Sequence, residues 1–156
     1  MALTQLTVVD TAVDILQQFG LADLSMRRLA KELDVQVGAL YWHVKNKQEL
    51  LAQVAAKLLN TPALAVRAED FASPGEAVLQ LMRKLYLALL PIQDSPEVIE
   101  VASAMQVKDL QPVLLLRSLL QQAGLVKLKF DCRFITIVCA VINDDLAWHW
   151  QVFEYV

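Results

Sequence analysis

Residues 24–51 constrain the fold more than any other stretch, because they place two short helical patterns on either side of a tight turn. Ser25 precedes the first pattern, and its hydroxyl can accept a free N–H of the first helical turn. Leu29, Ala30 and Leu33 then fall on one face at helical spacing. Asp34 follows where this helix must stop. The pattern predicts a helix over about residues 26–33 that ends in a turn.

A second and a third helix follow directly. The second is expected over residues 37–43, and the third starts near residue 47. Asn46 can cap the third helix, and Glu49 can reach back toward the same turn, which is a variant of the capping box. Two short helices joined by a tight turn form a helix-turn-helix, whose second helix is shaped to enter the major groove of DNA.

The charge of this stretch favours a nucleic-acid partner. Between residues 24 and 47, five basic side chains stand against two acidic ones, whereas the whole chain carries a net charge of −3. Phosphate contacts need a local basic patch and do not need a basic protein. The basic residues are Arg27, Arg28, Lys31, Lys45 and Lys47.

The run GALYWHVKNKQELL, at residues 38–51, resembles the signature that ends the DNA-binding domain of the TetR family of bacterial transcriptional repressors. The wider stretch from about residue 3 to residue 59, including FGLADLSMRRLAKELDV, is similar to that domain throughout. The YWHVKNK segment is particularly similar to the tetracycline repressors. The resemblance implies an N-terminal three-helix DNA-binding domain, followed by a helical ligand-binding and dimerisation domain.

Candidate DNA contacts follow partly from the residues and partly from the resemblance. Lysine is unfavourable in the first turn of a helix, so Lys47 is expected to serve a phosphate. The neighbours Tyr41, Trp42 and His43 cannot all be core, and an exposed tyrosine hydroxyl is a natural phosphate donor, although a core tyrosine is the alternative. One of Trp42 and His43 is expected to pack under the first helix, and the resemblance implies that the other touches the DNA backbone.

The resemblance further implies that Arg27 contacts a base edge; the alternative is a solvated arginine. It places Val37, Gly38 and Ala39 at the base-reading start of the recognition helix, yet their side chains carry no hydrogen-bonding group. Sequence specificity would then depend on Arg27, on Gln36 and on DNA shape. The complete set of candidate DNA-binding residues is Ser25, Arg27, Gln36, Val37, Gly38, Ala39, Tyr41, Trp42, His43 and Lys47.

The remainder of the chain reads as helices joined by breaks, so the predicted fold class is all-α. The expected helices cover about residues 4–19, 26–33, 37–43, 47–59, 74–90, 94–106 and 108–124, with a last helical region that Asp131 can cap. Residues 63–72 show no clean period and are expected to be an irregular join. The buried stripe of the first helix is predicted to be Val9, Ala12, Val13, Leu16 and Phe19, with Gly20 as its C-terminal stop.

This pattern divides the chain into a DNA-binding domain (1–46), a connecting helix (47–60) and a ligand-binding and dimerisation domain (61–156). The resemblance implies further C-terminal helices, so the expectation is either that the second domain is short or that the sequence omits segments of it. Hydrophobic residues make up 56% of the 156 residues, an excess that suggests burial against a second subunit. The longest apolar run is too short to span a membrane, and the N-terminus lacks a signal peptide, so a cytoplasmic protein is expected.

Adaptable apolar and aromatic residues in the second domain are candidates for a small-molecule pocket, with ordinary core packing as the alternative. Asp145 and His149 could share a metal or a proton, but a surface hydrogen bond is the simpler interpretation, and neither a cofactor nor a metal is expected. The candidate pocket residues are Met82, Tyr86, Met105, Phe134, Trp148, His149, Trp150 and Phe153.

The predicted function is a homodimeric transcriptional repressor that a small-molecule effector releases from double-stranded operator DNA. An enzyme is not expected, because the chain has two histidines, one of them in the DNA-binding motif, and no phosphate-binding glycine loop or HExxH sequence. The alternative is a helical adaptor that uses the helix-turn-helix for protein contacts.

Overall fold

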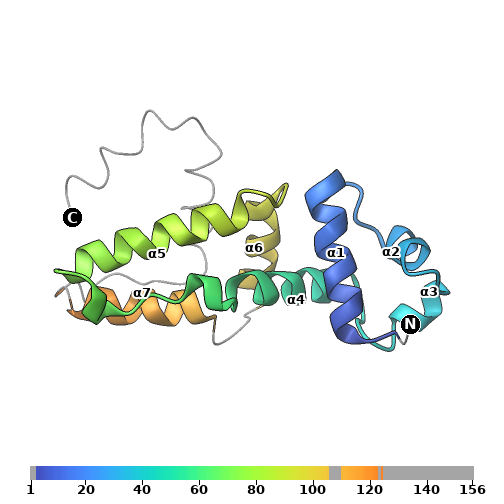
Figure 1. The fold of residues 1–156 in the computed structure, drawn as a ribbon. Coiled ribbons are helices and arrows are strands. Elements are labelled where there is room, and N and C mark those ends of the chain that lie inside the picture. Colours follow the sequence, from blue (N-terminus) through green and yellow to red (C-terminus); the bar gives the residue numbers. More distant parts are fainter. Residues whose placement is uncertain (1–2, 106–109, 123, 125–156) are drawn as a thin grey trace.

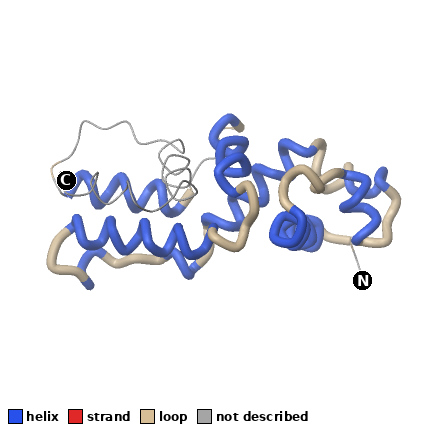
Figure 2. The backbone as a smooth tube through the Cα atoms, turned by 90° about the horizontal axis from the view of Figure 1, so that it is seen from above, coloured by secondary structure: helices blue, strands red, loops and turns tan. Residues whose placement is uncertain are grey.

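The computed structural model describes residues 3–105, 110–122 and 124, and this part of the chain contains helices and loops but no strand (Figure 2). The predicted all-α fold class is confirmed. The α-helices are α1 (Gln5–Phe19), α2 (Met26–Glu32), α3 (Val37–Leu40), α4 (Lys47–Leu59), α5 (Pro74–Leu89), α6 (Ser95–Ala104) and α7 (Gln111–Gln122), and two short 3-10 turns, η1 (Pro62–Leu64) and η2 (Ala68–Asp70), lie between α4 and α5.

The described helices form two groups that α4 connects (Figure 1). At one end of the molecule α1, α2 and α3 pack together, and at the other end α5 lies beside α7. Helix α4 packs against α1 at its start and against α6 further along. None of the described helices has the length and apolarity that a membrane crossing requires.

Helix α1 begins and ends as the sequence predicts. Thr4 caps it through a reciprocal pair of bonds with Thr7, and Gly20, at φ 77°, ends it. The predicted inner stripe is wrong at one position, because Phe19 is 44% exposed, whereas Val13 is half-buried and packs against the core. Phe19 is the last residue of the helix, and its ring lies under the guanidinium of Arg28, not in the core. The buried residues are Val8, Val9, Ala12, Ile15 and Leu16.

Helix α4 has the predicted N-terminal cap, with one difference. The side chain of Asn46 accepts a hydrogen bond from the backbone N–H of Glu49 at 2.8 Å. The carboxylate of Glu49 returns to the N–H of Lys45 at 2.6 Å, one residue before the cap. The first bond satisfies a backbone donor that the helix leaves free, and the second holds the residue before the cap, so together they determine where α4 starts.

The connection between α4 and α5 is irregular, as predicted. Arg67 and Glu69 form an exposed ion pair in it. Their side-chain hydrogen bond lowers the pKa of the Glu69 carboxyl and raises that of Arg67. Lys84 donates to the carbonyl of Ala65, which attaches this connection to α5.

The second group of helices also starts and ends close to the predicted positions. Ser73 caps α5 by accepting from Glu76, and α6 starts directly after Asp94. Helix α7 starts at residue 111, later than the predicted residue 108, although residues 106–109 are outside the described part. Asn60, at the end of α4, accepts from the N–H of Gln111 at 2.9 Å and so attaches the start of α7. The last predicted helical region, from Asp131, lies outside the described residues.

Loss of the Asn46 side chain should destabilise the protein without changing its fold. Asn46→Ala removes the acceptor for the first turn of α4 and should cost about 1 kcal/mol of stability, or about 3 °C in the unfolding midpoint. Thermal unfolding followed by circular dichroism measures this. Gln48→Ala, an exposed substitution in the same turn, is the control, and equal shifts for both variants would contradict the capping role.

Candidate nucleic-acid interface

The turn between α2 and α3 holds the helix-turn-helix together through backbone hydrogen bonds. After α2 ends, the N–H of Asp34 donates to the carbonyl of Lys31 at 3.2 Å, and the N–H of Val35 donates to Ala30 at 2.9 Å. This is the bonding pattern of a Schellman motif. Asp34 occupies the left-handed position at φ 52°, which aspartate tolerates better than most residues. The predicted stop at Asp34 is therefore confirmed.

Ser25 has a structural role at the other end of α2. Its hydroxyl accepts from the N–H of Arg28 at 3.2 Å, as the sequence predicts for a cap. The side chain is exposed, so the same hydroxyl also lies at the surface.

The two neighbouring arginines of α2 have opposite surroundings. Arg28 is held by Asp23 at 2.6 Å, by Glu32 at 3.8 Å and by the ring of Phe19, 3.8 Å from its guanidinium carbon. Arg27 is exposed and makes no hydrogen bond or ion pair with the described part of the chain. Arg27 is thus available for an external acceptor, whereas Arg28 stabilises the domain.

Helix α3 is shorter than the predicted 37–43 and ends at Leu40. The carbonyl of Leu40 accepts from the N–H groups of both His43 and Val44 at 2.9 Å, which tightens the chain into turns. These turns precede Asn46, whose extended backbone at φ −164° starts α4 in a new direction. The predicted helix, 37–43, is therefore too long, because its last residues take part in this change of direction.

No other described part of the chain packs against α3 at Gly38. A Cβ atom added at Gly38 would meet no other atom within 4 Å, so no packing inside the chain requires glycine there. Leu40 is fully buried and anchors the helix, while Val37 and Ala39 are half-buried. Gln36 precedes the helix, is exposed and makes no capping bond, so its amide is available to a partner.

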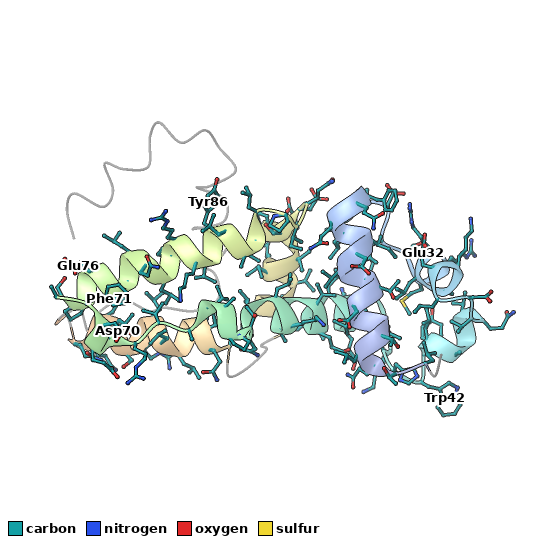
Figure 3. The ribbon with its side chains drawn as sticks, viewed as in Figure 1. Glu32, Trp42, Asp70, Phe71, Glu76 and Tyr86 are labelled. Carbon is teal, nitrogen blue, oxygen red and sulfur yellow. The ribbon has the colours of Figure 1, made fainter. Side chains whose placement is uncertain are left out.

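The aromatic run after α3 projects mostly into solvent. Trp42 is 89% exposed and Tyr41 is 52% exposed, while His43 is half-buried. Figure 3 shows Trp42 pointing away from the helices at the end of the molecule where α3 lies. The inference that these three residues cannot all be core is confirmed, and His43 is the least exposed of them.

Lys47 has a partner that sequence reasoning missed. Its ammonium donates to the carbonyl of Leu21, in the loop between α1 and α2, at 3.1 Å. This bond explains a lysine in the first turn of α4 without any ligand. An ammonium has further donors, so a phosphate contact by Lys47 stays a prediction.

The exposed cations of this region that lack a partner in the described chain define the basic surface: Arg27, Lys31 and Lys45. Lys57, further along α4, is paired with Asp10 of α1. The basic surface therefore lies around α2 and the turn before α4. The structure thus places unpaired cations, an open helix face and exposed aromatic groups in one region.

The candidate pocket residues are only partly described. Met82 lies in the core of α5, Tyr86 is half-buried on α5, and Met105 is 45% exposed after α6. Within the described residues, no group of three acidic, histidine or cysteine side chains could hold a metal. The other candidates, Phe134, Trp148, His149, Trp150 and Phe153, lie outside the described part, as does the Asp145–His149 pair.

Sequence reasoning also missed a contact between the two groups of helices. The carboxylate of Asp94, before α6, accepts from the N–H of Leu21 at 2.7 Å, and Gln93 donates to the carbonyl of Gln17 at 3.3 Å. Leu21 and Asp94 are 73 positions apart. No local spacing could have indicated such a pair.

This geometry defines the class of the protein, a helix-turn-helix protein with a second helical part. Residues 8–54 match the family model described as "Bacterial regulatory proteins, tetR family". Among curated proteins, the tetracycline repressor protein class D of Escherichia coli is 34% identical over 98 residues, which cover 59% of this chain and 42% of that repressor. The chain thus matches less than half the length of this relative.

Solved structures agree over most of the chain. BioQ of Mycobacterium smegmatis is 34% identical, with a TM-score of 0.75 over 98% of this chain and 92% of BioQ. The TetR family protein ActR of Streptomyces coelicolor, in complex with actinorhodin, is 28% identical, with a TM-score of 0.71 over 92% of this chain and 69% of ActR. The chain belongs to the TetR family.

Replacing each of the two arginines should separate binding from stability. Arg27→Ala should leave the unfolding midpoint nearly unchanged and cost about 1–3 kcal/mol per half-site in affinity for a selected duplex. Arg28→Ala removes the same charge but should mainly cost about 1 kcal/mol of stability, because its partners are within the domain. Fluorescence anisotropy on selected and scrambled duplexes, with thermal unfolding, measures both. Equal affinity losses for Arg27→Ala on the two duplexes would make it a phosphate contact.

The open face of α3 gives a second test. Gly38→Ala should keep or raise stability, by up to about 1 kcal/mol, because the new methyl group meets nothing inside the chain. If the helix lies against base edges, the same methyl group should cost about 1–3 kcal/mol in affinity for the selected duplex. Gly75→Ala, in the first turn of α5, is the matched control and should not change DNA affinity. Unchanged binding by Gly38→Ala would show that the helix does not approach the bases closely.

Proposed function

We propose that this chain is a sequence-specific DNA-binding transcriptional regulator, which acts in the bacterial cytoplasm as a homodimeric repressor and leaves its operator when a small molecule binds. The observation that carries the proposal is the helix-turn-helix with an open recognition-helix face beside unpaired cations. The structure of BioQ has also been solved with its natural double-stranded DNA operator. In that structure BioQ is 34% identical to this chain, over 99% of this chain and 93% of BioQ.

The contacts divide by chemistry into base reading and backbone binding. Arg27 and Gln36 are exposed and have donors for base edges, while Val37 and Ala39 can contact thymine methyl groups. Gly38 lets the helix approach. The residues proposed for the DNA backbone, which carry hydroxyl, ring N–H or ammonium donors, are Ser25, Tyr41, Trp42, His43 and Lys47.

A dimer is needed because a single helix-turn-helix reads only one half-site. Two such domains must lie about 34–36 Å apart to reach successive major grooves. Exposed leucines on α5 and at its C-terminal cap support an association surface, since Leu79, Leu87 and Leu90 are 46%, 57% and 61% exposed. Leu114 of α7 is 40% exposed as well. Burial of such side chains against a partner is favourable because it removes apolar area from water.

The effector is proposed to bind within the second group of helices, as the complex of ActR with actinorhodin suggests by analogy. Met82, Tyr86 and Met105 are the described candidates for its pocket, together with the later aromatic residues named above. An effector can lower operator affinity only if it binds better to a conformation that fits DNA less well. Helix α4 packs against both α1 and α6, so it provides a direct connection between the pocket and the DNA-binding helices. No residue is assigned a catalytic role.

Selection of duplexes from a randomised pool by the purified full chain tests this function. An inverted repeat should be enriched, and sedimentation should show two chains on one selected duplex. The logarithm of the binding constant should fall linearly with the logarithm of salt concentration, by about 0.9 for each neutralised phosphate.

The outcome separates the proposal from its alternative. A helical adaptor would enrich no sequence and would show no salt-dependent binding to DNA. Arg28→Ala protein serves as a control for loss of one charge without loss of a proposed contact. A monomeric complex on a single, unrepeated site would contradict the homodimer.

A further inference from the structure

The peptide groups beside Leu21 are held from two directions. The N–H of Leu21 donates to the carboxylate of Asp94 at 2.7 Å, and its carbonyl accepts from the ammonium of Lys47 at 3.1 Å. Asp94 precedes α6 and Lys47 opens α4, so one residue of the α1–α2 loop is bonded to both. Hydrogen bonds to charged groups are the shorter and stronger kind.

The two loops approach each other closely at this point. Gly20 is buried at φ 77°, and a Cβ atom added there would lie 2.9 Å from the Asp94 carboxylate and 3.1 Å from the Gln93 amide oxygen. Gln93 also donates to the carbonyl of Gln17, in the last turn of α1, at 3.3 Å. Figure 1 shows the corner between α5 and α6 beside that end of α1. Gly20 is therefore favoured by its backbone angle, and a side chain there would displace the ends of the Asp94 and Gln93 side chains.

Among the described residues, the side chain of Asp94 bonds to the α1–α2 loop and not to its own helix. Asp94 stands directly before α6, where an aspartate commonly caps its own helix. In the described chain its carboxylate instead accepts from Leu21, and its backbone adopts φ 57°, the left-handed conformation that aspartate tolerates better than most residues.

We propose that Asp94 is a positioning residue, which sets the orientation of the helix-turn-helix relative to α5–α7 by holding the N–H of Leu21. This inference rests on the proposed function, because orientation matters only if two DNA-binding domains must match a fixed half-site separation. The contact is exposed to solvent, so water can replace it at little cost to folding.

The test compares Asp94→Gly, Asp94→Asn and Glu100→Ala in the full chain. Glycine removes the carboxylate and accepts φ 57° without strain, so the fold should be retained. Asparagine keeps an oxygen acceptor and tolerates the same backbone angle. Glu100 is an exposed acidic residue of α6, and its replacement matches the loss of charge at a distance from Leu21.

The probes are the duplex selected by the wild-type protein, versions with the half-sites moved apart or together by single base pairs, and a duplex with one half-site. Wild-type protein should prefer one spacing. Asp94→Gly should lose affinity for that spacing by about tenfold or more, bind the altered spacings more evenly, and bind the single half-site within about twofold of wild type. Asp94→Asn and Glu100→Ala should behave as wild type. Exchange of the Leu21 amide hydrogen should be faster only in Asp94→Gly.

The possible outcomes are distinct. If wild-type protein selects no sequence, the proposed function fails and the inference fails with it. If wild-type protein selects a repeat but Asp94→Gly keeps the same spacing preference, only the positioning role is overturned. Equal losses on the full and single half-site duplexes, with a lowered unfolding midpoint, would also overturn it, because they would show a general structural effect.

Discussion

The burial of α4 against both groups of helices is the constraint on which the rest of the structure depends. Leu50, Leu51, Val54, Ala55 and Leu59 are all buried, and a single hydrophobic core extends from α1 to α7 through this helix. Because interiors pack densely, a displacement on one side of such a helix is passed to the other side and is not absorbed. The proposed response to an effector requires such a connection, and here it is built from ordinary aliphatic packing.

The polar contacts at the ends of α4 complete this arrangement. Lys47 attaches its start to the loop after α1, and Asn60 attaches its end to the start of α7. Asp94 then connects the same loop with α6. The helix-turn-helix is therefore held to the second group of helices by packing along α4 and by hydrogen bonds at one corner. Such bonds have strict distance and angle requirements, so they define orientation better than apolar contacts do.

The basic side chains fall into two groups, those that bond within the described chain and those that are available to a partner. Arg28, Lys47 and Lys57 have partners within the described chain, while Arg27, Lys31 and Lys45 have none there. A count of basic residues in the sequence cannot make this distinction, because the partners Asp23, Leu21 and Asp10 are found only in the folded chain. The local excess of positive charge predicted a nucleic-acid partner, but the structure reduces the number of cations that are available to one.

The sequence by itself determined the features that depend on neighbouring residues. Helix starts at Thr4, Ser25, Asn46 and Ser73 were predictable because a cap bonds within a few residues of itself, and helical periodicity identified most of the buried residues predicted for α1 and α2. The end of α3, the exposure of Phe19 and the bonds of Leu21 with Lys47 and Asp94 were decided by the tertiary structure. The reason is physical. These partners are 26 and 73 positions apart and come into contact only when α4 and α6 have packed, so no pattern of neighbouring residues in the sequence can predict the contacts.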